Sequence, residues 1–289
     1  LVAATLVASY PAIFGNLRRF EPNVALAAFV AAAALLLVVR GRLHNRRDAI
    51  VFGLLCSAGM LVDRVAFAVY LVPLVGVAFA AIWRDRATDD WRPALKQWGI
   101  VLGIGLLLCT YYYVLFFKNH VWEVLTQVEG EKTGMGETSD VLPFLSIRNL
   151  FYYPLSFIDC QMGLVLGAAT GAGVALYIAR GRALLEPPSR RMLEVWILFG
   201  LGLFTVVAKK QPFYSIPLLA PIALVAALGW RTVSLRPLRL ASAAVVLFFA
   251  VHQVGFLTMD RGIAPTPGKW AWLAGHSPLP PGFLGYEYI

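Results

Sequence analysis

The sequence predicts an all-α fold, a polytopic bundle of transmembrane helices with about nine crossings. Hydrophobic residues make up 59% of the 289 positions, charged residues only 14%, and the mean hydropathy is +0.71. A soluble domain carries roughly a quarter charged residues. Apolar runs also recur at the length of roughly 20 residues that a hydrocarbon core about 30 Å thick requires of a helix. Together these observations exclude a soluble globular domain.

Seven apolar runs each fit a single crossing. In order they are 1–14, 24–39, 98–117, 160–179, 193–208, 212–230 and 240–256. The longer run 49–83 decides the count, because Asp63 and Arg64 interrupt it. As one helix its 35 residues would extend about 52 Å, too long for one crossing, and a charge pair at the bilayer centre is costly. Two legs, 49–62 and 65–83, place the pair at one membrane surface and give nine crossings.

The basic residues orient this topology, because cytoplasmic loops are enriched in Lys and Arg. One face collects 15 basic residues against six acidic residues, a net charge of +9. The basic residues are Arg40, Arg42, Arg46, Arg47, Arg84, Arg86, Arg92, Lys96, Arg180, Arg182, Arg190, Arg191, Arg231, Arg236 and Arg239. The other face has nine basic and nine acidic residues. The positive excess is therefore assigned to the cytoplasmic face, and nucleic acid is not needed as a partner to explain it.

Residues 1–289 are expected to form a single transmembrane domain. Its outer loop, 118–159, is longer than structureless loops usually are, which indicates function or disorder. The end of this loop, 142–157, is aromatic and amphipathic and predicts a helix lying in the membrane interface. The tail 257–289 is also expected outside. Because the chain begins at Leu1 with a short apolar stretch and without the features of a signal peptide, we expect the C-terminal portion of a longer protein.

Glycines predict one helix contact in particular. Gly163, Gly167 and Gly171 recur every four residues within the run 160–179. A ridge of small residues lets two helix backbones approach closely. We therefore expect this ridge to face another helix.

Candidate chemistry lies in four charged patches, all on the outer face in this topology. The sequence contains no P-loop, no HExxH motif and no metal-spaced group of Cys and His. The patches hold Arg18, Arg19, Glu21 and Asn23 in the first outer turn, Asp63 and Arg64 in the second, Lys209 and Lys210 with Tyr214 in a late turn, and His120 and Glu129 in the outer loop. Together they would form a basic, partly acidic cavity at headgroup level. Such a cavity suits a phosphate anchored in the membrane.

Three of the four patches also have a simpler interpretation. The lysine pair would snorkel to the interface from the ends of its helices. The pair in the second turn would be a structural ion pair that closes a hairpin. The arginines of the first turn would bind anionic headgroups without selectivity. The concentration of cations in tight turns, on the face without a positive excess, favours the phosphate site.

Three segments resemble motifs of the GT-C superfamily of membrane glycosyltransferases, of the protein-mannosyltransferase and aminoarabinose-transferase type. The segment 10–37, YPAIFGNLRRFEPNVALAAFVAAAALLL, resembles the third and fourth spans of that family, with Asn23 where the family usually has Asp. The segment 53–73, GLLCSAGMLVDRVAFAVYLVP, resembles its Gly-x-x-x-Gly-x-x-x-Leu-x-Lys stretch, with Arg64 at the Lys position. The segment 208–229 resembles its late Lys-x-x-x-Tyr-x-x-Pro-x-x-x-Pro motif, through Lys210, Tyr214, Pro217 and Pro221.

The resemblance implies an enzyme in the bacterial inner membrane whose active face points outward. It implies inverting transfer of a sugar from a polyprenyl-phosphate donor to a hydroxyl of protein, lipid or polysaccharide. The implied ligands of the leaving phosphate are Arg64, Lys209, Lys210 and Tyr214. The expected partners are the lipid-linked sugar and membrane lipids. No organic cofactor is implied, and a divalent metal ion is left open.

The family's catalytic base is a carboxylate in its first outer loop, which would precede Leu1. Within the chain, Glu21 and Asp63 are the weaker candidates for a base. Two other classes stay open. A transporter or flippase of a lipid-linked sugar would also need an outer basic cavity, and a non-catalytic membrane subunit would need no cavity at all. Inverted repeats and broken mid-membrane helices are typical of transporters, and neither is visible in the sequence.

Overall fold

The computed structural model describes residues 2–10, 12, 13, 22–40, 43, 45–86, 91–115, 146–206, 212–234, 237, 238, 240, 241, 243, 244, 247, 248 and 251. In this part of the chain every regular element is a helix, which confirms the all-α fold. The α-helices are α1 (Val2–Ser9), α3 (Pro22–Arg40), α4 (Arg46–Val62), α5 (Arg64–Asp85), α6 (Arg92–Leu115), α8 (Ile147–Ser156), α9 (Leu164–Arg180), α10 (Pro187–Val206) and α11 (Leu219–Arg231). A π-helix, η1 (Phe157–Gln161), and two 3-10 helices, η2 (Gly181–Leu184) and η3 (Pro212–Leu218), lie between them.

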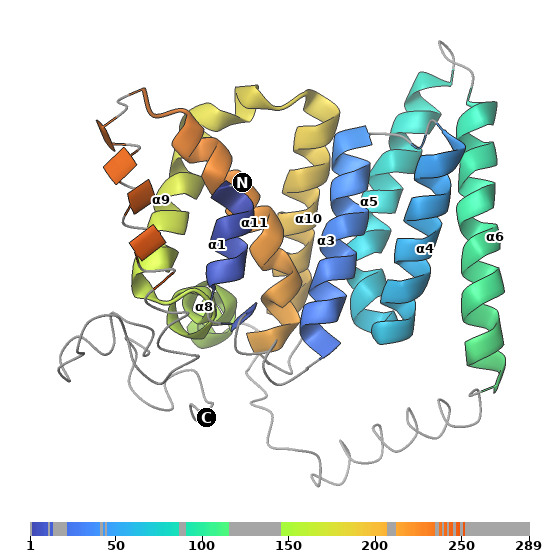
Figure 1. Ribbon diagram of the computed structural model, residues 1–289, viewed down its shortest axis with the longest axis horizontal. Coiled ribbons are helices and arrows are strands. Elements are labelled where there is room, and N and C mark those ends of the chain that lie inside the picture. Colours follow the sequence, from blue (N-terminus) through green and yellow to red (C-terminus); the bar gives the residue numbers. More distant parts are fainter. Residues whose placement is uncertain are drawn as a thin grey trace, which may run out of the picture.

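The long helices run up and down through one bundle, with α3 in its middle (Figure 1). The α3 helix packs against α4 and α5 on one side and against α10, α11 and η3 on the other. Its buried residues recur every three or four positions, as the inward stripe of a helix does. They are Leu26, Ala27, Val30, Ala33, Ala34, Leu37 and Val38. The alanines among them let the neighbouring helices come close to the α3 backbone.

The apolar run 49–83 is divided into two helices at Asp63, as the sequence predicts. Asp63 has extended backbone angles, φ −154° and ψ 103°, between the end of α4 and the start of α5. Its carboxylate accepts a hydrogen bond from the N–H of Ala66 at 3.0 Å, and its own N–H donates to the carbonyl of Gly59 at 3.1 Å. Aspartate is a preferred residue at a helix N-cap. One residue therefore ends α4 and begins α5.

The helices α9 and α11 approach each other closely, at glycines outside the predicted ridge. A Cβ atom built on Gly229 would lie 1.8 Å from the carbonyl oxygen of Gly173, so only glycine fits there. The predicted ridge is wrong at two of its three glycines, since only Gly167 packs on another element: a Cβ atom built there would lie 3.4 Å from the Cα atom of Ile158 in η1. Gly171 has no atom within 4 Å of such a Cβ, and Gly163 caps α9 with a φ of 74° that side chains disfavour. Residue 173 lies about 200° around the helix from residue 171, so the packing face of α9 is a different one.

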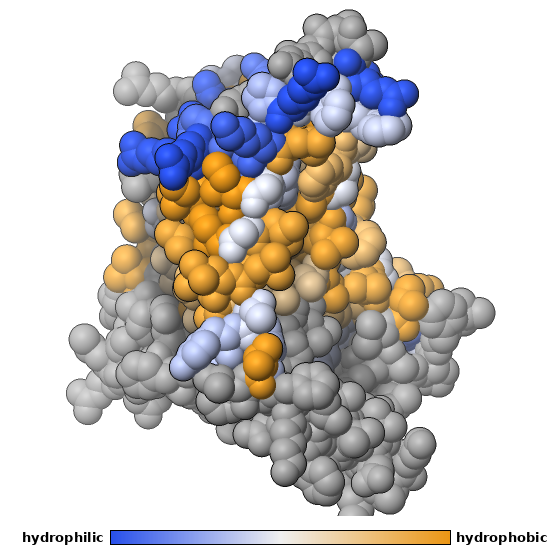
Figure 2. Space-filling view, turned by 90° about the vertical axis from the view of Figure 1, so that its right-hand side faces the viewer, coloured by the Kyte–Doolittle hydropathy of each residue, from blue (hydrophilic) through white to orange (hydrophobic). Residues whose placement is uncertain are grey.

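Basic residues gather at one end of the bundle, which we call the basic end. There α3, α5, α9 and α11 end and α4, α6 and α10 begin (Figure 1). The described basic residues at these helix ends are Arg40, Arg46, Arg47, Arg84, Arg86, Arg92, Lys96, Arg180, Arg182, Arg190, Arg191 and Arg231. On the face shown in Figure 2, hydrophilic residues cover this end and a broad hydrophobic band lies below them. The helix directions thus bring to one end those residues of the predicted cytoplasmic face that the structure describes.

Four helical segments in the described residues are long and apolar enough to cross a membrane. They are Pro22–Arg40, Ala66–Arg84, Arg92–Val114 and Tyr214–Arg231. Two further helices, α4 and α9, have 17 residues each, at the lower limit for a crossing. The 20-residue α10 carries three charged residues in its first two turns. The predicted crossing 240–256 falls mostly outside the described residues, and residues 118–145 and the tail 257–289 fall wholly outside them.

The amphipathic segment predicted at the end of the outer loop forms α8. This helix lies across the end of the bundle opposite the basic end, where Figure 1 shows it along its own axis. Ser146 caps it by accepting the N–H of Asn149 at 3.1 Å. Tyr152 and Tyr153 are buried against the bundle, whereas Ile147 is 77% exposed. An apolar exposed face is what a helix lying in the membrane interface presents to lipid.

Candidate functional site

The candidate site lies at the α8 end, the end of the bundle that holds α8, η3 and the α4–α5 turn at Asp63. The 3-10 helix η3 is central to it, because α3, α8, η1 and α10 all pack against η3. These elements come from the first outer turn, the outer loop and the late turn of the predicted topology. Segments far apart in the sequence are therefore adjacent at this end.

An aromatic cluster joins these elements around Phe204 of α10. Phe204 stacks on Tyr214 of η3, with ring centroids 5.7 Å apart and ring planes at 22°. It also contacts Tyr70 of α5 at 5.5 Å and Tyr153 of α8 at 6.0 Å. Aromatic pairs at such separations stabilise beyond the area that they bury. The Phe204 ring thus links α5, α8 and η3 to α10.

A hydrogen bond fixes the backbone of η3 within this cluster. The hydroxyl of Tyr70 donates to the main-chain carbonyl of Tyr214. Tyr70 is almost completely buried, and Tyr214 is half-buried. The bond ties α5, the helix that begins at Arg64, to the turn that carries Tyr214. The backbone of Tyr214 is therefore held by an interaction that does not use its own side chain.

A second, polar group lies beside the aromatic rings. The side-chain amide of Gln161 in η1 donates to the hydroxyl oxygen of Ser215 at 2.7 Å and to that of Ser156 at 3.1 Å. All three residues are buried. Because buried polar groups are costly without hydrogen bonds, this network fixes the position of η1 and η3 relative to α8. It places polar groups next to Tyr214.

The structure brings some of the predicted site residues to the α8 end. Tyr214 lies in the aromatic cluster, Asn23 lies half-buried in the first turn of α3, and Arg64 is the first residue of α5. Asp63 acts as the cap between α4 and α5, which is a structural role. The remaining predicted residues lie outside the described part of the chain: Arg18, Arg19, Glu21, His120, Glu129, Lys209 and Lys210.

Sequence reasoning missed Tyr70, Phe204 and Gln161. Of these three residues, only Gln161 could have been identified from the sequence, because a polar residue inside an apolar run usually has a specific partner. Tyr70 and Phe204 stand in uniformly apolar runs where no pattern distinguishes them. The Tyr152–Tyr153 pair was noted only as part of an interfacial helix, and the structure adds its contact with the cluster.

The described residues contain no group of three or more His, Cys, Asp and Glu side chains that could hold a metal ion. Comparisons of the chain with protein-family models, with curated proteins and with solved structures find no match. The class that the fold defines is an α-helical bundle with helices long and apolar enough to cross a membrane.

Proposed function

We propose that this chain forms the membrane domain of a glycosyltransferase, which moves a sugar from a polyprenyl-phosphate donor to a hydroxyl acceptor at the α8 end. One observation carries the proposal. The three segments that resemble GT-C motifs, which belong to α3, to the α4–α5 hairpin and to η3 with α11, meet at this end. The packing of α3 on η3 and the bond from Tyr70 to Tyr214 join them.

The proposal includes nine crossings, with the basic end in the cytoplasm. Eight of the predicted runs correspond to helices, namely α1, α3, α4, α5, α6, α9, α10 and α11. The helices alternate in direction along the chain between the basic end and the α8 end (Figure 1). Positive charge marks cytoplasmic loops, so the α8 end is assigned to the outer face. This orientation puts Arg64 and Tyr214 where a donor lipid would present its phosphate from the outer leaflet.

The chemistry requires a cationic site for a leaving phosphate and a carboxylate for an acceptor proton. The acceptor hydroxyl oxygen forms a bond to the anomeric carbon, the bond from that carbon to the phosphate oxygen breaks, and its electron pair stays on the phosphate. The carboxylate takes the hydroxyl proton. Arg64, Lys209 and Lys210 would stabilise the charge that develops on the phosphate, and the Tyr214 hydroxyl would donate to it. Glu21, directly before α3, is the candidate carboxylate within this chain.

Sugar transfer in membrane vesicles tests the proposal. The protein is expressed from its natural gene and supplied with a labelled polyprenyl-phosphate sugar. Arg64→Ala and Lys210→Ala should each lower transfer about 30- to 150-fold, because a charge-assisted contact to a desolvated phosphate contributes about 2–3 kcal/mol. Arg191→Ala, an exposed arginine at the basic end, is the matched control and should leave transfer unchanged.

The outcomes separate the three classes of protein. Loss of transfer in the two variants, with the control active, supports the transferase. Movement of intact donor lipid across the vesicle membrane without sugar transfer would instead identify a flippase. Wild-type protein that neither moves donor nor transfers sugar would identify a non-catalytic subunit.

A further inference from the structure

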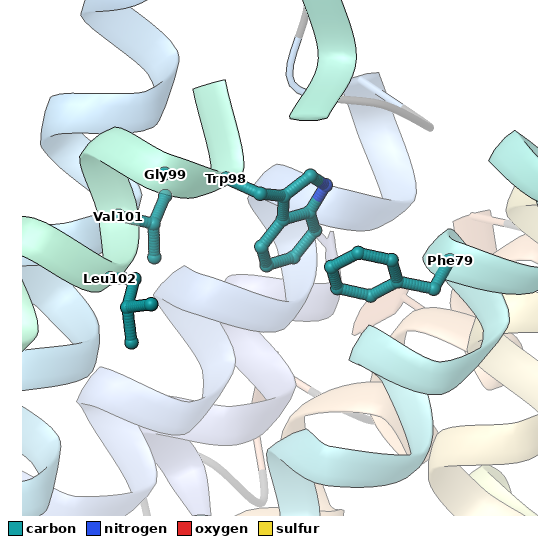
Figure 3. A pocket seen from close by; sticks show the side chains of 5 residues that line it. All are labelled: Phe79, Trp98, Gly99, Val101 and Leu102. Atoms are coloured by element: carbon teal, nitrogen blue, oxygen red, sulfur yellow. The ribbon is translucent and has the colours of Figure 1, made fainter. Parts of the chain in front are cut away.

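A groove opens on the side of the bundle between α5 and α6, in the half nearer the basic end. It has a volume of about 380 Å³ and is lined by Phe79 of α5 and by Trp98, Gly99, Val101 and Leu102 of α6. Figure 3 shows the Phe79 and Trp98 rings side by side, and their centroids are 4.8 Å apart, so the two rings are in contact and form one wall. Trp98 also meets Phe52 of α4 edge-to-face at 5.5 Å, which fixes the indole ring. We call this the α5–α6 groove.

The groove faces outward and its walls are apolar. Leu102 is 63% exposed and Phe79 is 39% exposed, so its lining is part of the outer surface. Gly99 leaves it open, because a Cβ atom built there would meet no atom within 4 Å. Among the residues that the structure describes, no charged side chain lines it. Within a membrane such a groove would hold a hydrocarbon chain by shape and dispersion contacts.

Cationic side chains stand above the groove at the basic end. Phe79, Trp83 and Arg86 are spaced i, i+4 and i+7, so they share one face of α5. The Arg86 guanidinium lies 3.8 Å from the centroid of the Trp83 ring, a cation–π contact. On α6, Lys96 lies one turn before Gly99 and is exposed. Phe79 is about 10 Å below Arg86 along the helix. A lipid whose phosphate lies at Arg86 would therefore have its acyl chains at the level of Phe79.

The net charge at this corner is positive. Six basic residues begin or end α4, α5 and α6 here, or lie in the α5–α6 turn, against four acidic residues in the same stretches of sequence. One of those acidic residues, Asp48, forms an ion pair with Arg40 of α3 at 3.4 Å. Basic pockets between helices on the cytoplasmic side attract anionic headgroups, and exposed Trp83 marks the interfacial level.

We propose that the α5–α6 groove binds one anionic phospholipid of the cytoplasmic leaflet. An acyl chain lies in the groove against Phe79, Trp98 and Leu102, and Arg86 and Lys96 contact the phosphate of the headgroup. This site is at the end opposite the proposed sugar-transfer site and uses none of its residues. It requires the membrane embedding of the chain, but not the glycosyltransferase activity.

Native mass spectrometry tests the proposal on protein reconstituted with equal amounts of phosphatidylglycerol and phosphatidylcholine and then transferred to mild detergent. Wild-type protein should retain one phosphatidylglycerol in preference to phosphatidylcholine. Gly99→Leu should lower the retention about tenfold, which corresponds to about 1.4 kcal/mol, because leucine fills the groove from a position where a Cβ atom meets no atom within 4 Å. Gly103→Leu is the matched control and should bind as wild type, since Gly103 is also exposed with no atom within 4 Å, one turn farther along α6.

A variant without the two cationic side chains distinguishes recognition of the lipid headgroup from binding of the acyl chain. Arg86→Gln combined with Lys96→Gln should abolish the preference for phosphatidylglycerol while keeping binding of either lipid. Equal retention of the two lipids by wild-type protein would overturn the proposal, as would equal effects of the Gly99 and Gly103 variants. Circular dichroism of each variant checks that helicity is kept. A protein inactive in sugar transfer but selective for phosphatidylglycerol would refute the proposed function and leave this site standing.

Discussion

The hydroxyl of Tyr70 in α5 donates a hydrogen bond to the main-chain carbonyl of Tyr214 in η3, 144 residues later in the chain. The residues around this bond are buried and largely apolar, so the carbonyl would lack a donor if the hydroxyl were removed. A 3-10 helix leaves carbonyl groups that its own short ladder does not satisfy well. The bond therefore sets where η3 sits against α5, and with it the position of the Tyr214 ring.

Tyr70→Phe tests this relationship. Removal of the hydroxyl leaves a buried carbonyl without its donor and should destabilise the protein by about 1–3 kcal/mol, seen as a lower midpoint of thermal unfolding in detergent. Sugar transfer should fall further than stability alone explains, because η3 loses its fixed position. Tyr113→Phe is the control, since the Tyr113 hydroxyl donates to the carbonyl of Met60 at 2.7 Å in the α4–α6 contact. A similar loss of transfer in both variants would contradict the special role of the η3 bond.

Asp63 is expected to act as a helix cap and not as a catalytic base. Asparagine caps a helix about as well as aspartate, so Asp63→Asn should keep both the unfolding midpoint and sugar transfer. Asp63→Ala removes the acceptor of the Ala66 N–H and should cost about 1 kcal/mol of stability. Loss of transfer by about 100-fold or more in Asp63→Asn, with stability unchanged, would instead show that the carboxylate is the base.

The helix pattern could be predicted because the membrane penalises charge strongly. Asp63 and Arg64 in an apolar run required a break, and the structure has that break at Asp63. The amphipathic α8 was visible because its polar and aromatic residues alternate at helical spacing. Both features rest on the contrast between polar and apolar side chains, which a sequence shows directly.

The inward faces of the apolar helices could not be predicted for the opposite reason. Within α10, Trp196 is buried and Leu198 is 67% exposed, yet both are apolar. Where lipid and protein interior are equally apolar, hydropathy carries no information on which face packs. Hence a close helix contact was expected on the ridge of Gly163, Gly167 and Gly171, whereas α9 approaches α11 at Gly173 and Gly229. For the same reason Phe204, at the centre of the aromatic cluster, was not predicted.

The α9–α11 contact gives a prediction on stability. Gly229→Ala places a methyl group within 1.8 Å of the Gly173 carbonyl, so the two helices must separate. Such overpacking costs about 1–3 kcal/mol, and the midpoint of thermal unfolding should fall. Gly171→Ala on α9 is the matched control, because its methyl group meets open space. An alanine is favoured over glycine in a helix, so this variant should be as stable as wild type or slightly more stable.

Membrane orientation gives the last prediction. The turn between α9 and α10 lies at the basic end, where Leu184 is exposed, and position 135 lies in the loop that the topology places outside. In a background with Cys56, Cys109 and Cys160 replaced by alanine, Leu184→Cys should react with a membrane-impermeant maleimide only after the membrane is opened. Met135→Cys should react in intact cells, because cytoplasmic loops carry the positive excess and this loop does not. Labelling of both cysteines in intact cells would put the two positions on the same side and contradict the nine-crossing topology. Labelling of Leu184→Cys alone would reverse the topology and place the basic end outside. The α8 end would then face the cytoplasm, and an outward-facing sugar-transfer site around Tyr214 would be excluded.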